Sequence, residues 1–168
     1  MRARSGGYSL LELVAILVVI GILAAVVAPR LDAGTERAAT TQADALRRNL
    51  AHVQALALGW GDSLRLTVTA NSYNVTCLTN IGAACATAGV GNIPKDPATG
   101  DNFTVSLTDN VTLAAVGGNT VDFDSLGRPT SGGALIAGNP ARTYTFTGGT
   151  RSATVTLRPI TGFAETSY

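Results

Sequence analysis

Charged side chains are scarce in this sequence. Asp, Glu, Lys and Arg make up 14% of its 168 residues, whereas ordinary soluble domains contain about 25%. The 12 basic side chains are nearly balanced by 11 acidic ones. This balance argues against a general nucleic-acid coat, because such a protein needs excess positive charge to neutralise phosphates. The length fits one folded domain plus a membrane anchor.

Histidine is rarer still, and His52 is the only one. Hydrolysis by a Ser-His-Asp set requires an oriented imidazole, but His52 lies inside a predicted helix, where a packed or solvated histidine is the simpler interpretation. A zinc site would need more Cys or His ligands. No glycine-rich phosphate loop is present, although the chain has 19 glycines. The sequence therefore predicts no enzyme, no catalytic residue, no cofactor and no metal site.

A pair of carboxylates leaves open the alternative that the protein binds a cation. Asp122 and Asp124 alternate along a predicted strand, so both are expected on the same face. Together with Asp109 or Asn119 they could bind a cation such as calcium. The competing interpretation is that these groups only solubilise a strand and its turn.

The clearest feature that is present is an apolar run from Tyr8 to Ala28, which Glu12 alone interrupts with a charge. A carboxylate in a membrane-length segment costs roughly 2.5–3.5 kcal/mol on insertion scales, so it marks a function and needs a partner. Cleavage between Gly7 and Tyr8 would create an ammonium group four residues before that carboxylate. Processing would therefore supply the missing cation.

The residues from Arg2 to Glu12 resemble the class III signal of type IV pilins and type II secretion pseudopilins. In that signal a short basic leader ends in Gly, an aromatic residue follows, and a Glu lies four positions further on. Tyr8 stands where Phe is usual. The resemblance implies a leader at 1–7, cleavage and N-methylation by prepilin peptidase, and an assembly role for Glu12. Pro29 matches the helix-kinking proline of these proteins.

Length and flanking charge predict how this segment sits in a membrane. The 21 residues from Tyr8 to Ala28 span about 31 Å as a helix, enough to cross a hydrocarbon core of ~30 Å. Arg2 and Arg4 precede the segment without acidic neighbours. The positive-inside rule then predicts a single pass at 8–29, with lipid of the inner membrane as a partner and the remaining chain in the periplasm.

Two other interpretations of the segment compete with this one. A secretory signal peptide would be cut near Ala28 and would release a secreted β-domain that acts as a binding module. The apolar core is long for such a signal, it contains Glu12, and the small residues near Ala28 run into Pro29. A plain signal-anchor helix is the second alternative. N-terminal analysis separates them, because the mature chain would start at Tyr8 or near Pro29.

Residues 30–60 are predicted to form an amphipathic helix that continues the membrane segment. Its apolar positions recur at steps of four, three and four, namely Leu46, Leu50, Val53 and Ala57. The opposite side carries Asp44, Arg47, Arg48 and Gln54. The run Gly59 to Gly61 should end the helix.

Residues 61–168 are rich in Thr, Val, Gly and Asn, and they predict a β-domain. Eight strands are expected, at 64–69, 73–78, 103–107, 111–115, 120–123, 134–137, 143–147 and 153–157. The loop 79–102 is expected to be irregular, and no second helix is expected after residue 60. The predicted fold is therefore α+β, a long N-terminal helix packed on a small antiparallel two-sheet domain.

Two cysteines, Cys77 and Cys85, flank a loop of Gly, Ala and Asn. In an extracytoplasmic compartment such a pair most simply forms a disulfide. Closing so short a loop stabilises a fold by about 2–3 kcal/mol in the chain-entropy model.

Two segments near the C-terminus add to the resemblance. The turn Phe123–Pro129 and the end Val155–Phe163 are similar to those of H-type minor pseudopilins, FimT-like minor pilins and minor pilins of the mannose-sensitive haemagglutinin pilus. FimT-like proteins can contact DNA through surface arginines, which would implicate Arg128, Arg142, Arg151 and Arg158 in DNA uptake. Otherwise these arginines only solubilise strands and turns. The resemblance implies a structural subunit whose partners are other pilins or pseudopilins.

Overall fold

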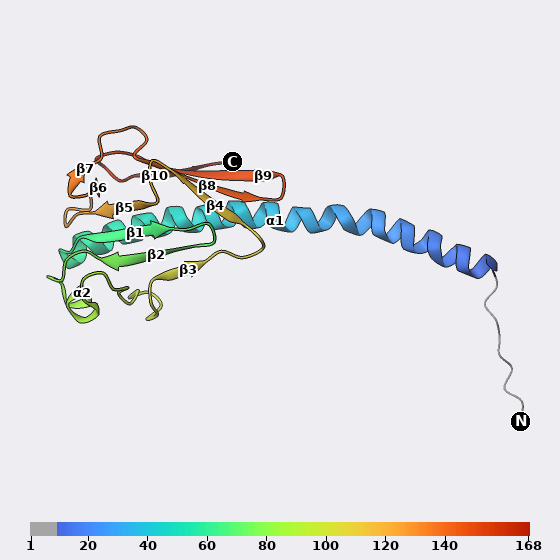
Figure 1. Cartoon of the computed structure of the whole chain (residues 1–168), viewed down its shortest axis with the longest axis horizontal. Helices are drawn as coiled ribbons and strands as arrows, with labels where there is room; N and C mark the ends of the chain where they lie inside the picture. Colours follow the sequence, from blue (N-terminus) through green and yellow to red (C-terminus); the bar gives the residue numbers. More distant parts are fainter. Residues whose placement is uncertain (1–9) are drawn as a thin grey trace, which may run out of the picture.

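A single long helix organises the protein. The computed structural model describes residues 10–168, apart from the side chains of residues 25–33. Helix α1 spans Leu10–Trp60, 51 residues and roughly 76 Å, and half of it projects from the globular domain (Figure 1). Gly61 has a φ of 70°, the left-handed conformation that commonly follows a helix end. The predicted end of the helix at Gly59 to Gly61 is therefore confirmed.

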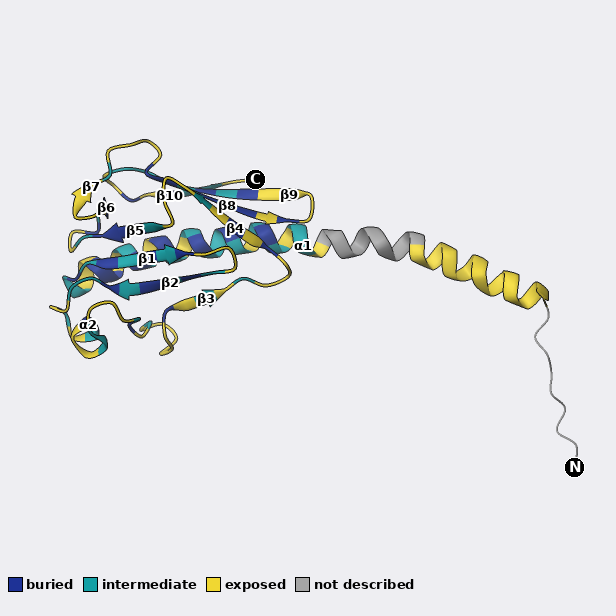
Figure 2. Ribbon diagram, in the orientation of Figure 1, coloured by how far each residue is buried: buried dark blue, intermediate teal, exposed yellow. Residues whose placement is uncertain are grey.

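The two halves of α1 differ in exposure. Residues 10–24 are exposed without exception, whereas the half within the domain alternates between buried and exposed positions (Figure 2). Its buried positions recur every three or four residues: Ala39, Ala43, Leu46, Leu50, Val53 and Ala57. This repeat confirms the predicted apolar face, which an amphipathic helix turns towards a core.

The globular domain contains ten strands in two antiparallel sheets. The strands are β1 (Leu64–Val68), β2 (Ser72–Cys77), β3 (Thr104–Ser106), β4 (Thr112–Val116), β5 (Thr120–Phe123), β6 (Pro129–Ser131), β7 (Ala134–Leu135), β8 (Arg142–Gly148), β9 (Arg151–Leu157) and β10 (Ala164–Ser167). One sheet has the order β3-β2-β1-β5-β6-β7, and the other has the order β10-β9-β8-β4. The predicted α+β fold with two sheets is confirmed.

The core lies between α1 and the two sheets. The helix packs chiefly on β8, β9 and β10, and to a smaller extent on β1 and β5. Strand alternation supplies the other side of the core: Leu64, Leu66 and Val68 in β1 are buried, as are Tyr144 and Phe146 in β8. Strand β4 belongs to the second sheet although it lies between β3 and β5 in sequence. The chain therefore passes from the first sheet to the second after β3 and returns to the first sheet before β5.

Some sequence expectations for the β-domain are wrong. The loop 79–102 contains a short helix, α2 (Ala83–Ala88), where irregular chain and no second helix were expected. Its run of alanines has no apolar periodicity long enough to reveal a helix. Strands β6 and β10 were missed because each has only three or four residues. These two strands are recognised by their pairing with β5 and β9, and their own sequences give little indication of a strand.

The turn between β8 and β9 contacts α1 where the helix enters the domain. Gly148 lies so close to the Thr35 carbonyl oxygen that a Cβ at this position would collide with it. The Thr150 hydroxyl donates to Glu36, and the Arg151 Nε lies 3.3 Å from the same carboxylate. Among the described side chains of α1, contacts with the globular domain therefore begin near residue 35, and residues 10–24 are bare.

Candidate functional site

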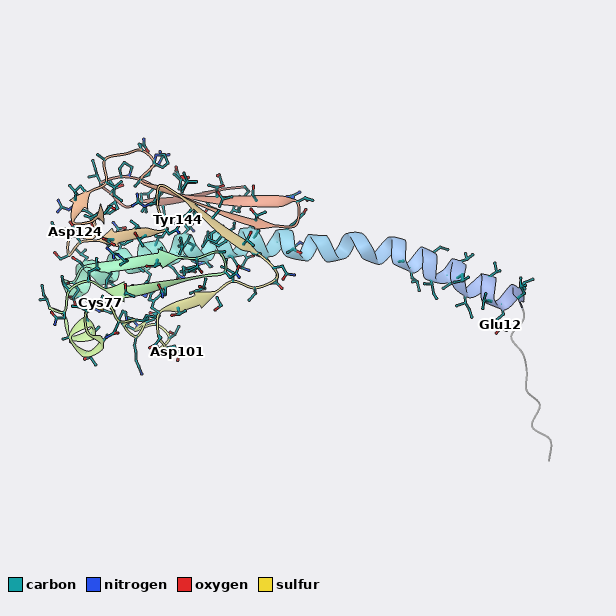
Figure 3. All side chains as sticks on the ribbon, in the orientation of Figure 1. Glu12, Cys77, Asp101, Asp124 and Tyr144 are labelled. Atoms are coloured by element: carbon teal, nitrogen blue, oxygen red, sulfur yellow. A yellow bond between two sulfur atoms is a disulfide. The ribbon has the colours of Figure 1, made fainter. Side chains whose placement is uncertain are left out.

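The bare half of α1 is the first candidate site. It exposes eleven large apolar side chains from Leu10 to Leu23, each 47–82% accessible. Glu12 lies in the first turn, near the free end of the helix (Figure 3). Ala15, Ile16, Val19 and Ile20 form with it a shallow, mainly apolar hollow along one side. So much exposed apolar surface in one segment is typical of an interaction site.

The other N-terminal predictions concern parts that the structure does not describe. Gly7 and Tyr8 lie outside the described residues, as does the side chain of Pro29. Cleavage at Gly7 and a kink at Pro29 therefore remain predictions. Among the described residues, no helical segment combines the length and hydropathy that a membrane crossing requires.

The two C-terminal turns meet on one residue of the helix. The Gln54 side-chain amide donates to the carbonyl oxygen of Gly127, at 2.8 Å, and to that of Thr161, at 2.7 Å. Gly127 and Gly162 both pack on the Gln54 side chain with positive φ angles of 72° and 67°. A larger residue would be strained there and would collide with Gln54. The helix thus fixes both turns through a single amide group.

Asp124 organises the first of these turns. Its Oδ1 accepts hydrogen bonds from the amides of Leu126 (3.0 Å) and Arg128 (2.8 Å), and its Oδ2 accepts one from the Arg128 guanidinium at 2.9 Å. Burial opposes ionisation of this carboxyl, but the hydrogen bonds and the arginine outweigh it and hold its pKa below the usual 3.8. The arginine predicted as a DNA contact is thus used within its own turn.

The other three predicted DNA contacts also have partners within the chain. Arg142 is buried and donates to the carbonyl oxygens of Thr120 (2.9 Å) and Ala141 (2.7 Å). Arg158 pairs with Glu165 and Asn139, and Arg151 pairs with Glu36. Arg151 and Arg158 lie at opposite ends of β9, roughly 20 Å apart. Each of the four arginines therefore has a partner within the chain, and a contact with DNA stays a prediction.

The carboxylates considered for a cation are separated as well. Asp122 is buried and accepts two hydrogen bonds from Arg65, at 2.6 and 2.9 Å. Asp124 binds Arg128 instead. Each carboxylate is therefore neutralised by its own arginine, which corrects the expectation that the two could share an ion. Among the side chains that the structure describes, at residues 10–24 and 34–168, no three acidic, His or Cys groups are arranged to hold a metal.

His52 has a partner that the sequence did not indicate. Its Nε2 lies 3.0 Å from the Asp96 Oδ1, and its ring stacks on Phe103 with centroids 5.8 Å apart. Burial disfavours the Asp96 anion, but hydrogen bonds from the Ala98 amide and His52 outweigh this effect and keep its pKa below 3.8. The expectation of a packed helix histidine is confirmed. The contact ties the loop 79–102 to α1.

The disulfide between Cys77 and Cys85 is formed, as predicted, with the two Cα atoms 5.7 Å apart. It joins the end of β2 to α2, at the end of the domain far from Glu12 (Figure 3). Asp62, which sequence reasoning missed, is fully buried beside it and accepts hydrogen bonds from Thr79, Ile81 and Gly82 at 2.7–2.8 Å. An acidic residue two positions after the end of α1 gave no signal of this role.

Comparison with known proteins gives matches at the level of structure only. Neither a protein-family model nor a curated protein sequence matches the chain. Two structures of the minor pseudopilin EpsH from the type II secretion system of Vibrio cholerae superpose with TM-scores of 0.55 and 0.56. Their sequences are 14% and 13% identical to this one. The superpositions include 77% and 79% of this chain and 95% and 97% of the EpsH chains.

A type IV minor pilin shows the same arrangement. FimU from Pseudomonas aeruginosa superposes with a TM-score of 0.51 and 8% identity, over 76% of this chain and 87% of its own. Identities this low are informative about the fold and not about the individual function. The long helix, the two sheets and these superpositions lead to one conclusion: the chain has the type IV pilin-like fold that minor pilins and minor pseudopilins share.

Proposed function

We propose that this protein is a structural subunit, a minor pilin or minor pseudopilin, that is built into a filament through its N-terminal helix. The observation that carries the proposal is the bare half of α1, which exposes apolar side chains from Leu10 to Leu23 and a single carboxylate, Glu12. A lone apolar helix is unfavourable in water, so it must be covered by lipid or by other helices.

The first step of this function is processing at the N-terminus. Residues 1–7 form a basic leader that prepilin peptidase removes after Gly7, and the new terminus at Tyr8 is methylated. Glycine at position 7, which leaves room beside the cleaved bond, and the aromatic residue at position 8 support the proposal. Before assembly, residues 8–29 hold the protein in the inner membrane with the β-domain in the periplasm, and Pro29 bends the helix where it leaves the lipid.

The second step is assembly by side-by-side packing of helices. Glu12 of an incoming subunit pairs with the ammonium group of Tyr8 on a neighbour already in place. An unpaired charge in an apolar environment costs several kcal/mol, so the axial position that pairs both charges is strongly favoured. Whether pilus or secretion machinery uses the subunit depends on its partners.

Replacement of Gly7 tests the proposal directly. Gly7→Val should leave the leader attached, because a peptidase that cuts beside a small residue has little room for a β-branched side chain. Electrophoresis and intact-mass measurement would detect the retained residues 1–7, and Ser5→Ala provides a leader variant that should be cut normally. Normal cleavage of Gly7→Val would remove the main support for this processing step, whereas a mature terminus near Pro29 would favour the secreted β-domain.

A further inference from the structure

An exposed apolar surface surrounds the two turns that meet on Gln54. Leu126 precedes Gly127 in the first turn, and Ile160 and Phe163 flank Thr161 and Gly162 in the second. The exposed fractions of Leu126, Ile160 and Phe163 are 62%, 59% and 61%. Leu58, one turn beyond Gln54 on the helix, is 60% exposed. Four large apolar side chains from three segments are therefore presented to solvent around one point of the helix.

The adjoining helix surface is also without charge. From Asn49 to Trp60, α1 contains no Asp, Glu, Lys or Arg. Ala51 and Ala55 are exposed there and lie on the same side as Leu58. Small side chains allow another helix to approach closely. We call Ala51, Ala55, Leu58, Leu126, Ile160 and Phe163 the distal apolar surface.

The backbone holds one member of this surface in an unusual conformation. Ile160 has a φ of 63°, a region that a β-branched residue rarely adopts. Glycine would fit the turn without strain, and the Ile160 side chain gains little from burial because 59% of it is exposed. The folded chain alone gives no reason for isoleucine at this position. A partner that covers the side chain would give one.

The length of the bare helix indicates what covers the distal apolar surface. Among the side chains that the structure describes, contacts of α1 with its own domain begin near Thr35, so the helix runs roughly 37 Å from Leu10 to Gly34 before them and roughly 39 Å from Thr35 to Trp60. The two halves have nearly the same length. Consider a neighbouring subunit whose helix runs parallel to α1 and is shifted by one half-length towards the globular domain in Figure 1. The bare half of that helix then lies beside the packed half of α1.

We infer that the distal apolar surface is the docking surface for the bare helical half of a neighbouring subunit with this same architecture. The inference rests on the proposed function, which supplies the parallel packing of helices. It also gives the two C-terminal turns a role, because Gln54 fixes them where Leu126, Ile160 and Phe163 extend the exposed helix surface onto the β-domain. The loop 79–102 takes no part, since His52 and Gln54 point about 200° apart around the helix.

Photocrosslinking in the bacterium tests this surface with the full-length chain. A photoreactive phenylalanine analogue replaces Phe163, and in separate strains Val90 or Val19. Val90 is the matched control, because it is 58% exposed but belongs to the loop after α2. The probe at 163 should crosslink to the helical segment that precedes the globular domain of a second subunit, as mapped by mass spectrometry, and the probe at 90 should not.

The probe at Val19 separates failure of this inference from failure of the proposed function. If position 19 crosslinks to neighbouring helices but position 163 reaches only globular domains, or gives the same products as position 90, the docking surface is wrong and the assembly role stands. Absence of helix crosslinks from position 19 would overturn the proposed function, and the inference with it.

A substitution at Ile160 provides a second test that a purely structural role would not pass. Ile160→Gly suits the positive φ, so the melting temperature of the detergent-solubilised chain should be unchanged or higher. Incorporation into filaments should nevertheless fall, on the order of tenfold, because a large apolar contact is lost. Val90→Ala should assemble like the wild type. Wild-type incorporation of Ile160→Gly would overturn the inference.

Discussion

The side-chain amide of Gln54 lies 2.8 Å from the carbonyl oxygen of Gly127, and the same nitrogen lies 2.7 Å from that of Thr161. These partners are separated from Gln54 by 73 and 107 positions in the sequence. One helix residue thus holds two turns that are distant in the chain. The hydrogen bonds connect α1 to the end of the β-domain.

Loss of the Gln54 amide should destabilise the domain. Gln54→Ala removes two hydrogen bonds, each worth about 1 kcal/mol, so the free energy of unfolding should fall by roughly 1–2 kcal/mol. Urea unfolding of the detergent-solubilised chain measures this change. Ala55→Ser, an exposed change on the next residue, is the control. A loss for Gln54→Ala no larger than that for Ala55→Ser would contradict the role assigned to the amide.

Two buried tyrosines should respond in opposite ways to loss of the hydroxyl. Tyr73 accepts a hydrogen bond from the Asn49 side chain at 2.8 Å, whereas the buried Tyr144 hydroxyl has no hydrogen-bond partner among the residues that the structure describes. Tyr73→Phe should therefore cost about 1 kcal/mol, because Asn49 loses its acceptor, and Tyr144→Phe should be neutral or stabilising. Thermal unfolding of the pair makes the comparison. Equal losses would show that the two hydroxyls have equivalent environments.

Stability should fall in acid, partly through Asp96. The pKa of this carboxyl is below 3.8 in the folded chain, so its contribution is fully present above pH 3.8 and is lost as the pH falls through the lower folded value. Asp96→Asn should reduce the difference in stability between pH 5 and pH 3. Asp109→Asn is the control, because Asp109 is exposed and, within the described part of the chain, its side chain accepts a hydrogen bond from neighbouring Thr108 alone. The idea fails if both variants retain the full acid dependence.

Reduction of the disulfide should loosen the loop 79–102 more than the β-core. The bond closes a loop of sequence separation 8, and its loss should cost about 2–3 kcal/mol in the chain-entropy model. Hydrogen exchange on the Cys77→Ser/Cys85→Ser double variant should rise around α2, while β8 and β9 stay protected. Uniformly faster exchange across the domain would show that the bond supports the whole fold.

Substitution of Glu12 tests the pairing of charges in assembly. Glu12→Ala should still insert and be cleaved, because removal of a charge makes insertion easier. It should assemble poorly because the axial position is no longer selected, and Glu12→Gln separates charge from shape. Leader cleavage and the filament fraction are scored by immunoblotting. Wild-type incorporation of both variants would leave the segment as a membrane anchor only.

Local pattern is the reason that α1 and its buried face were predictable. Leu46, Leu50 and Val53 recur with the helical period, and such a repeat can be recognised without any knowledge of distant residues. The hairpin of β1 and β2 has the same local character, since its strands alternate and its turn is short. The disulfide was predictable because only two cysteines exist, and they are close in sequence.

Short elements and side-chain partners were not predictable in this way. Strand β10 has four residues and exists through its pairing with β9. Helix α2 has six residues, too few for a helix to be stable without tertiary contacts. The arginines drew attention as possible DNA contacts, yet the sequence could not show that Arg142 is buried or that Arg128 binds Asp124.

By itself, the sequence determined the elements whose signals are local: the apolar helix with Glu12, the amphipathic face that follows it, and the change to a β-domain after Gly61. Only the tertiary structure decided which charges and turns meet, as Gln54 does with Gly127 and His52 with Asp96. The physical reason is the range of the interactions. Helical and strand periods repeat over a few residues, whereas hydrogen bonds and ion pairs across the domain depend on the packing of the whole chain.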